Sequence, residues 1–135
     1  MPNSIIVRLL RVICGISLVG CTTSSPDIGN PISIDYCYDG DTCTSTTGEK
    51  IRLACIDTPE LRGSKADPIP AKESRDYLRS FIKDKSITLI RYTTDRYGRT
   101  VGELYANGSN VQQEMVRAGH AKIYTKYASQ CSWAN

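Results

Sequence analysis

Five segments of the chain alternate between apolar and polar side chains, or combine β-branched and aromatic residues between turn signals. Both features are typical of short, half-buried β-strands. The hairpin between the second and third segments is expected to turn near Thr47-Gly48. Asp39-Gly40 and Asn107-Gly108 mark further tight turns. The five predicted strands are residues 32–37, 41–46, 50–56, 86–92 and 100–106.

Two other segments have helical periodicity. Residues 71–83 place Ala71, Ser74, Leu78, Phe81 and Ile82 on one face and charged side chains on the other. Residues 111–118 predict a short helix that stops at Gly119. Five strands with a helix between the third and fourth predict an α+β, mainly β fold. We expect a closed five-stranded OB-type Greek-key barrel with two helices, formed by residues 31–135.

The N-terminal residues have the layout of an export signal. Arg8 and Arg11 precede a short apolar run, which is too short to span a bilayer. Residues 1–20 are therefore predicted to be a signal peptide, and residues 21–30 a flexible tether. Leu18-Val19-Gly20-Cys21 resembles the bacterial lipobox, which predicts a lipid on Cys21 and a membrane-anchored protein of the cell envelope. An ordinary signal peptide or an uncleaved N-terminal segment are the alternatives.

The overall charge gives no argument for nucleic-acid binding. Loss of residues 1–20 would remove two of the 17 basic residues and leave 15 against 14 acidic ones. Any phosphate binding must therefore come from a local arrangement of Arg and Lys side chains.

The cysteines favour disulfides over a zinc site. The chain has six cysteines, a single histidine (His120) and no CxxC pair. Cys14 lies in the predicted signal peptide and Cys21 in the lipobox. Four cysteines remain, and they permit three pairings: Cys37, Cys43, Cys55 and Cys131.

Three segments combine carboxylates and arginines in a way that suits phosphodiester cleavage. They are Asp39-Gly40-Asp41-Thr42, the run from Arg52 to Glu60, and Asp95-Arg96-Tyr97-Gly98-Arg99. Carboxylate oxygens bind Ca²⁺ or Mg²⁺, and guanidinium groups match the geometry of phosphate. Phosphoryl transfer depends mainly on positioning and on neutralising charge, so this combination predicts a metal-assisted phosphodiesterase. Taken singly, each residue is better explained as a turn former, a cap, a surface acid or a salt-bridge partner.

These motifs, with Val116-Arg117-x-Gly119-x-Ala121 after them, occur in the order and spacing of a known family. Over residues 31–127 the chain resembles the staphylococcal nuclease (thermonuclease) family. The resemblance implies a Ca²⁺-dependent endonuclease that cleaves DNA and RNA with little sequence specificity and leaves 3′-phosphate ends. It implies no protein partner, so we expect a monomer.

The resemblance also assigns roles to individual residues. Asp41, Asp57 and the backbone carbonyl of Thr58 match the calcium ligands. Glu60 matches the general base, and Arg52 and Arg99 match the two arginines that bind the phosphate. Arg96, Tyr97 and Tyr127 match substrate-contacting positions, although the chain has Thr125 where a further aromatic residue is expected. His120 and Asp39 are assigned no catalytic role.

The family resemblance bears on the end of the chain as well. The family barrel is followed by a final amphipathic helix, whereas this sequence ends at Asn135, where that helix should begin. We therefore expect a shortened domain in which disulfides compensate. The family chain turns back toward the active site near this point, which favours a Cys55–Cys131 bond, with Cys37–Cys43 as the second pair. A noncatalytic OB-fold module that binds nucleic acid and an inactive truncated nuclease are the alternative functions.

Overall fold

The computed structural model describes residues 28–135. The predicted signal peptide, the lipobox with Cys21 and most of the predicted tether lie outside the described residues. The elements, in chain order, are β1 (Asn30–Pro31), β2 (Ile34–Cys37), β3 (Thr42–Ser45), β4 (Lys50–Leu53), β5 (Ile56–Asp57), α1 (Pro68–Ile82), β6 (Ile87–Thr94), β7 (Thr100–Ala106), β8 (Ser109–Asn110), α2 (Val111–Arg117), β9 (Lys122–Ile123) and the 3₁₀ helices η1 (Thr125–Gln130) and η2 (Ser132–Ala134).

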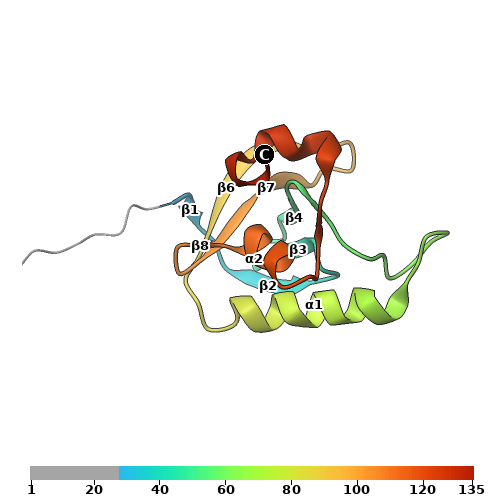
Figure 1. The fold of residues 1–135 in the computed structure, drawn as a ribbon. Helices are drawn as coiled ribbons and strands as arrows, with labels where there is room; N and C mark the ends of the chain where they lie inside the picture. The colour runs from blue at the N-terminus through green and yellow to red at the C-terminus, as the bar shows by residue number, and fades with distance from the viewer. Residues whose placement is uncertain (1–27) are drawn as a thin grey trace, which may run out of the picture.

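One strongly connected sheet forms the centre of the domain. Its strands follow the order β1-β6-β7-β4-β3-β2, with β8 paired to β7, and β5 and β9 form a separate pair. The β4–β7 pairing is parallel and the others are antiparallel. Helix α1 lies along the β2 side of this sheet, and the C-terminal 3₁₀ helices lie at the opposite end of the domain, near β6 and β7 (Figure 1).

The α+β, mainly β prediction of an OB-type fold is confirmed, but the prediction of a closed barrel is wrong. β1 and β2 stand at the two ends of the strand path and follow one another along the chain through Ile32 and Ser33; no ladder among residues 28–135 pairs β1 with β2 and closes that path. The edge of β2 is instead covered by α1, because Arg79 donates from Nε and Nη2 to the carbonyl of Cys37 at 3.0 and 2.6 Å. A guanidinium group thus takes the acceptor that a neighbouring strand would have used.

The predicted third strand is interrupted. The sequence predicted residues 50–56 as one strand, but β4 ends at Leu53 and β5 begins at Ile56. Cys55 adopts φ of 66°, which no strand can accommodate. Ala54 still donates its backbone N–H to the carbonyl of Gly102 at 2.8 Å. The chain therefore leaves the sheet at a sharp bend just before Asp57.

The two helices were predicted with small errors at their ends. Helix α1 starts at Pro68 rather than residue 71, since proline in the first turn lacks only an N–H that would have had no helical partner. Of the predicted face, Ala71, Ser74 and Leu78 are buried, whereas Phe81 and Ile82 are partly buried and pack against the core. Helix α2 stops before Gly119, whose φ of 81° ends it as expected.

The core lies between the sheet and the two helices. It is built from buried aliphatic side chains with one fully buried polar residue, Gln112. Gln112 accepts from the N–H of Leu104 at 3.1 Å and donates to the carbonyl of Gly102 at 2.9 Å, which fixes α2 against β7. The largest members of the cluster are Ile51, Leu53, Ile56, Leu78, Leu89, Leu104 and Met115. No helix within residues 28–135 combines the length and the apolar character needed to cross a membrane.

Gly102 allows β6 and β7 to approach closely. A Cβ atom at this position would lie 2.2 Å from the carbonyl oxygen of Ile90. We therefore expect Gly102→Ala to lower the free energy of unfolding by about 3 kcal/mol or more, at the upper end of overpacking effects. Urea unfolding of the variant measures this loss.

Gly48→Ala is the matched control for that measurement. Gly48 has φ of 87°, but an added Cβ would meet no atom within 4 Å, so only its backbone conformation opposes the change. Gly48→Ala should lower the free energy of unfolding by about 1 kcal/mol. If Gly102→Ala and Gly48→Ala lower the free energy of unfolding equally, β6 and β7 do not approach each other as closely as this structure shows.

Candidate active site

Asp41 lies at a tight turn directly before β3 and is buried. The side chain of Asp39 accepts the backbone N–H of Asp41 at 3.0 Å, which holds the turn in shape. Gly40 packs so closely that an added Cβ would lie 2.9 Å from both Thr58 Cγ2 and Ser74 Cβ. The Asp39-Gly40-Asp41 turn therefore rests on the segment that follows β5.

Arg52 joins the two predicted metal-binding segments. Its Nη2 lies 3.3 Å from Oδ2 of Asp41 and donates to the carbonyl of Ile56 at 2.8 Å. Its Nη1 donates to the carbonyl of Leu53 at 2.5 Å. One guanidinium group therefore connects the Asp41 carboxylate with the residue before Asp57. The structure thereby brings the segments of Asp41, Arg52 and Asp57 together.

Thr58 contributes a polar atom without a partner in the described part of the chain. Its Oγ1 is completely buried and makes no hydrogen bond within residues 28–135. It lies near enough to Asp41 to lower that carboxyl's pKa slightly, although the geometry of a hydrogen bond is not met. Asp57, one residue earlier, is exposed on β5 opposite Lys122. The site thus combines the carboxylates of Asp41 and Asp57 with the Thr58 hydroxyl, which lacks the hydrogen bond that a buried hydroxyl usually makes.

Arg99 is linked to the same carboxylate through Thr42. Its Nη1 lies 3.5 Å from Oγ1 of Thr42, which in turn donates to Oδ1 of Asp41 at 3.1 Å. Of the two predicted phosphate-binding arginines, Arg52 therefore contacts Asp41 directly, and Arg99 is linked to it through Thr42. The resemblance assigned both arginines to phosphate binding but did not predict this linkage to Asp41.

Asp95 holds Arg99 in place, a role that the sequence analysis did not assign. Its Oδ2 accepts from Nε of Arg99 at 2.7 Å, and its Oδ1 accepts the backbone N–H groups of Tyr97 and Arg99 at 2.9 and 3.0 Å. Burial acts to raise the pKa of Asp95, but these hydrogen bonds and the Arg99 charge outweigh it and lower the pKa. An aspartate at the start of a turn that ends in arginine was the available sequence signal.

The predicted substrate residues lie on the surface around this centre. Tyr97 is 66% exposed, and Nη2 of Arg96 donates to its hydroxyl at 2.7 Å. Tyr127 is partly exposed and meets the ring of Tyr124 edge-on, with centroids 5.1 Å apart. No hydrogen bond or ion pair within the described part of the chain links these side chains to Asp41.

Glu60 lies exposed in the loop after β5. Its backbone carbonyl accepts the N–H of Asp67 at 2.9 Å, which fixes the loop next to the start of α1. Its carboxylate makes no hydrogen bond or ion pair to residues 28–135 that would commit it to a structural role. No hydrogen bond or ion pair among the described residues links the Glu60 side chain to Asp41. His120 stacks on Tyr77 with ring centroids 4.4 Å apart, which agrees with a structural role.

The electrostatics of Asp41 favour a cation. Burial, the largest effect, and the nearby Asp39 raise the pKa of Asp41 to about 7, while the positive charge of Arg52 opposes the rise. The described residues contain no cluster of three or more His, Cys, Asp or Glu side chains that could hold a metal ion. A site here would therefore use Asp41, Asp57, the neighbouring threonine oxygens and water. These hard oxygen donors fit Ca²⁺, and a divalent cation would add the positive charge that the buried carboxylate lacks.

Comparison with known proteins identifies the sequence pattern. A family model described as "Staphylococcal nuclease homologue" matches residues 50–134. The match begins at Lys50, so the turn with Asp41 lies just before it. Arg52, Asp57, Glu60 and Arg99 all fall within the matched span.

Curated relatives carry related names. A "Staphylococcal-like nuclease CAN1" of Arabidopsis thaliana is 39% identical over 90 residues, which are 64% of this chain and 26% of that protein. An "Uncharacterized endonuclease" of Escherichia coli O157:H7 is 40% identical over 93 residues, 66% of this chain and 58% of that protein. Another "Uncharacterized endonuclease", from Haemophilus influenzae, is 37% identical over 94 residues, 67% of this chain and 50% of that protein. This chain therefore spans between about a quarter and three fifths of these relatives.

The raised pKa of Asp41 makes stability depend on pH when no divalent metal is bound. Between its ordinary value of 3.8 and about 7, the native protein holds a proton that the unfolded chain has released. The free energy of unfolding should therefore fall as pH rises through this window, and Asp41→Asn should remove that part of the decline. Urea unfolding of both proteins at several pH values, in the presence of a chelator, measures this pH dependence.

Asp35→Asn, on the exposed face of β2, is the matched control and should keep the wild-type pH dependence. If Asp41→Asn and wild type show the same decline between pH 4 and 7, the Asp41 carboxyl is not the group responsible.

Proposed function

Because the chain belongs to the staphylococcal nuclease family, we propose that it is an endonuclease that hydrolyses phosphodiester bonds of DNA and RNA with little sequence preference. The observation that carries this proposal is that Arg52 contacts the buried carboxylate of Asp41 directly and that Arg99 is linked to the same carboxylate through Thr42. Two guanidinium groups beside a carboxylate provide binding sites for a phosphate and for a cation within one small volume.

The arginines would bind the scissile phosphate. Arg99 is held by Asp95 through Nε, and its Nη1 lies 3.5 Å from Oγ1 of Thr42, the residue next to Asp41. Arg52 now donates to two backbone carbonyls, so it must exchange at least one of these bonds for a phosphate oxygen. Two guanidinium groups in these positions would stabilise the extra negative charge of the five-coordinate transition state.

Asp41, Asp57 and Thr58 would hold calcium. When bound, the ion would neutralise charge on the phosphate and orient water beside it. The raised pKa of Asp41 supports this assignment, because burial disfavours its charged form and a divalent cation would offset that effect. Thr58, whose backbone carbonyl is the expected ligand, also has a buried Oγ1 without a hydrogen-bond partner among residues 28–135.

Glu60 would act as the general base. Its carboxylate is exposed and uncommitted, and its backbone is fixed to Asp67 at the start of α1. A carboxylate in that position could accept a proton from an attacking water. Nothing in this scheme uses a 2′-hydroxyl group, which supports activity on both DNA and RNA. The basic and apolar layout of residues 1–20 and the lipobox at Cys21 support export to the cell envelope.

Calcium-dependent digestion tests the proposal directly. We expect the full chain to cleave a single-stranded DNA oligonucleotide and an RNA of the same sequence in Ca²⁺, and to lose this activity in excess chelator, since the candidate ligands are hard oxygen donors. Gel electrophoresis of the products measures cleavage, and readdition of Ca²⁺ is the control. Tight binding of the oligonucleotide without cleavage would identify a noncatalytic binding module instead.

Two substitutions test the assigned roles. Glu60→Gln and Arg99→Lys should each lower kcat by about 10² or more, because a general base and a bidentate guanidinium each contribute an effect of that order. Both side chains are at least partly exposed, so the fold should persist.

Glu73→Gln on α1 and Arg117→Lys on α2 are the matched controls, because both residues are exposed and lie outside the candidate site. They should keep near wild-type rates. Wild-type turnover in Glu60→Gln or Arg99→Lys would mean that the corresponding role is misassigned.

A further inference from the structure

The two disulfides lie on either side of the candidate site. Cys37 and Cys43 face each other on β2 and β3, with Cα atoms 3.8 Å apart, and enclose the Asp39-Gly40-Asp41 turn. Cys55 and Cys131 are 76 positions apart in the sequence, with Cα atoms 6.3 Å apart. These are the two pairs that the sequence analysis favoured. The two disulfides differ in how far the position of the segments that they join depends on the bond.

Cys37 and Cys43 are held in place without their bond. They are direct partners in the β2–β3 ladder, and α1 adds two hydrogen bonds from Arg79 to the Cys37 carbonyl. Breaking this disulfide would leave the same strands side by side.

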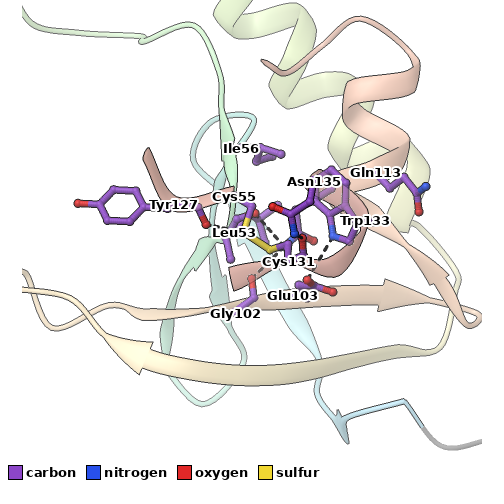
Figure 2. The surroundings of a disulfide bond; sticks show 12 residues. Leu53, Cys55, Ile56, Gly102, Glu103, Gln113, Tyr127, Cys131, Trp133 and Asn135 are labelled. Atoms are coloured by element: carbon purple, nitrogen blue, oxygen red, sulfur yellow. Dashed lines mark hydrogen bonds between the residues drawn. A yellow bond between two sulfur atoms is a disulfide. The ribbon is translucent and has the colours of Figure 1, made fainter. Parts of the chain in front are cut away.

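The C-terminal segment, residues 124–135, has far less to hold it. Neither η1 nor η2 contains a buried residue, and Cys131, which lies between them, is fully buried. Cys131 and Cys55 form a small separate cluster with Ala54, against which Val101, Trp133 and Ala134 pack. Apart from the disulfide, the hydrogen bond from Nε1 of Trp133 to Oε1 of Glu103 at 3.2 Å links the end of this segment to β7 (Figure 2), and Trp133 also packs against the main core.

This weakly held segment carries the predicted substrate tyrosine, Tyr127, and its neighbour Tyr124. The backbone N–H of Tyr124 donates to the carbonyl of Cys55 at 2.8 Å, and the Tyr127 carbonyl lies 3.3 Å from Sγ of Cys55. The Tyr127 ring extends away from the disulfide, on the side opposite Trp133 (Figure 2). Cys55 itself lies two positions before Asp57. The disulfide thus connects the tyrosine-bearing segment to the strand that leads into the metal-binding residues.

We propose that the Cys55–Cys131 disulfide is a redox control of substrate binding, which rests on the nuclease function proposed above. With the bond formed, Tyr124 and Tyr127 are held beside the site and can stack on unpaired bases. A dithiol would transfer two electrons to the bond and leave two thiols, each with one added proton, while the dithiol becomes a cyclic disulfide. The segment is then released, and substrate affinity falls.

The consequence for the cell follows from the redox state of each compartment. In a reducing cytoplasm the enzyme would bind nucleic acid weakly, and in an oxidising compartment it would gain affinity. Such an arrangement would limit damage to the cell's own nucleic acid before export.

The test compares the oxidised full chain with Cys55→Ala/Cys131→Ala and with the matched control Cys37→Ala/Cys43→Ala. Removal of the Cys55–Cys131 bond should raise KM for a single-stranded DNA oligonucleotide about tenfold or more, the effect expected when one base-stacking contact is lost. It should change kcat less. The control should keep KM within about twofold of wild type, because its C-terminal segment is untouched.

Trp133 provides a readout that needs no activity, because it is the single tryptophan of the chain. Its emission should shift to longer wavelength when Cys55–Cys131 is removed or reduced by a dithiol, and should stay unshifted in the control. Mass spectrometry after alkylation assigns the thiols. Unchanged KM and unchanged emission in Cys55→Ala/Cys131→Ala would overturn the proposal.

Tyr127→Ala keeps the inference testable even if the double-cysteine variant does not fold. Its ring is partly exposed, so the oxidised variant should fold and show the same rise in KM with the disulfide intact. Wild-type KM in this variant would also overturn the proposal. If the oxidised wild type cleaves nothing, the nuclease function fails, while anisotropy of a labelled oligonucleotide and Trp133 emission still decide whether the disulfide controls binding.

Discussion

A buried carboxylate in direct contact with one arginine is the constraint on which the candidate site depends. Nη2 of Arg52 lies between Oδ2 of Asp41 and the carbonyl of Ile56, so one group draws the start of β3, the end of β4 and the start of β5 together. Burial raises the pKa of Asp41 despite this pairing. The site is therefore short of positive charge. Binding of a cation and a phosphate would change the contact between Arg52 and Asp41.

Periodicity and turn residues were sufficient to predict most of the fold. The turn at Gly48, the buried face of α1 and the stop of α2 before Gly119 each follow from local physical chemistry. The bend at Cys55 could not be predicted, because a positive φ at a non-glycine residue is imposed by tertiary contacts. The open strand path also depends on a distant residue, Arg79, which covers the edge of β2.

The candidate site was predictable through the resemblance more than through its residues one at a time. Each acid and arginine had an ordinary structural explanation until the order of the motifs was considered. The role of Asp95 could not be predicted from the sequence, because it rests on three hydrogen bonds that the Asp95 side chain accepts in the folded structure. The structure has two short 3₁₀ helices near the C-terminus, η1 before the point where the sequence analysis expected a final helix to begin and η2 at that point. Cys131 joins them to Cys55, and Trp133 donates to Glu103 of β7.

A crystal structure of the oxidised protein with Ca²⁺ and a noncleavable oligonucleotide would test the central claim most directly. The account predicts calcium bound to the carboxylates of Asp41 and Asp57, with Arg52 and Arg99 donating to the same phosphate. It also predicts that the contact between Arg52 and Asp41 is lost or lengthened from its 3.3 Å. Calcium bound away from both aspartates, with Arg52 still paired to Asp41 and no phosphate beside Arg99, would contradict the account.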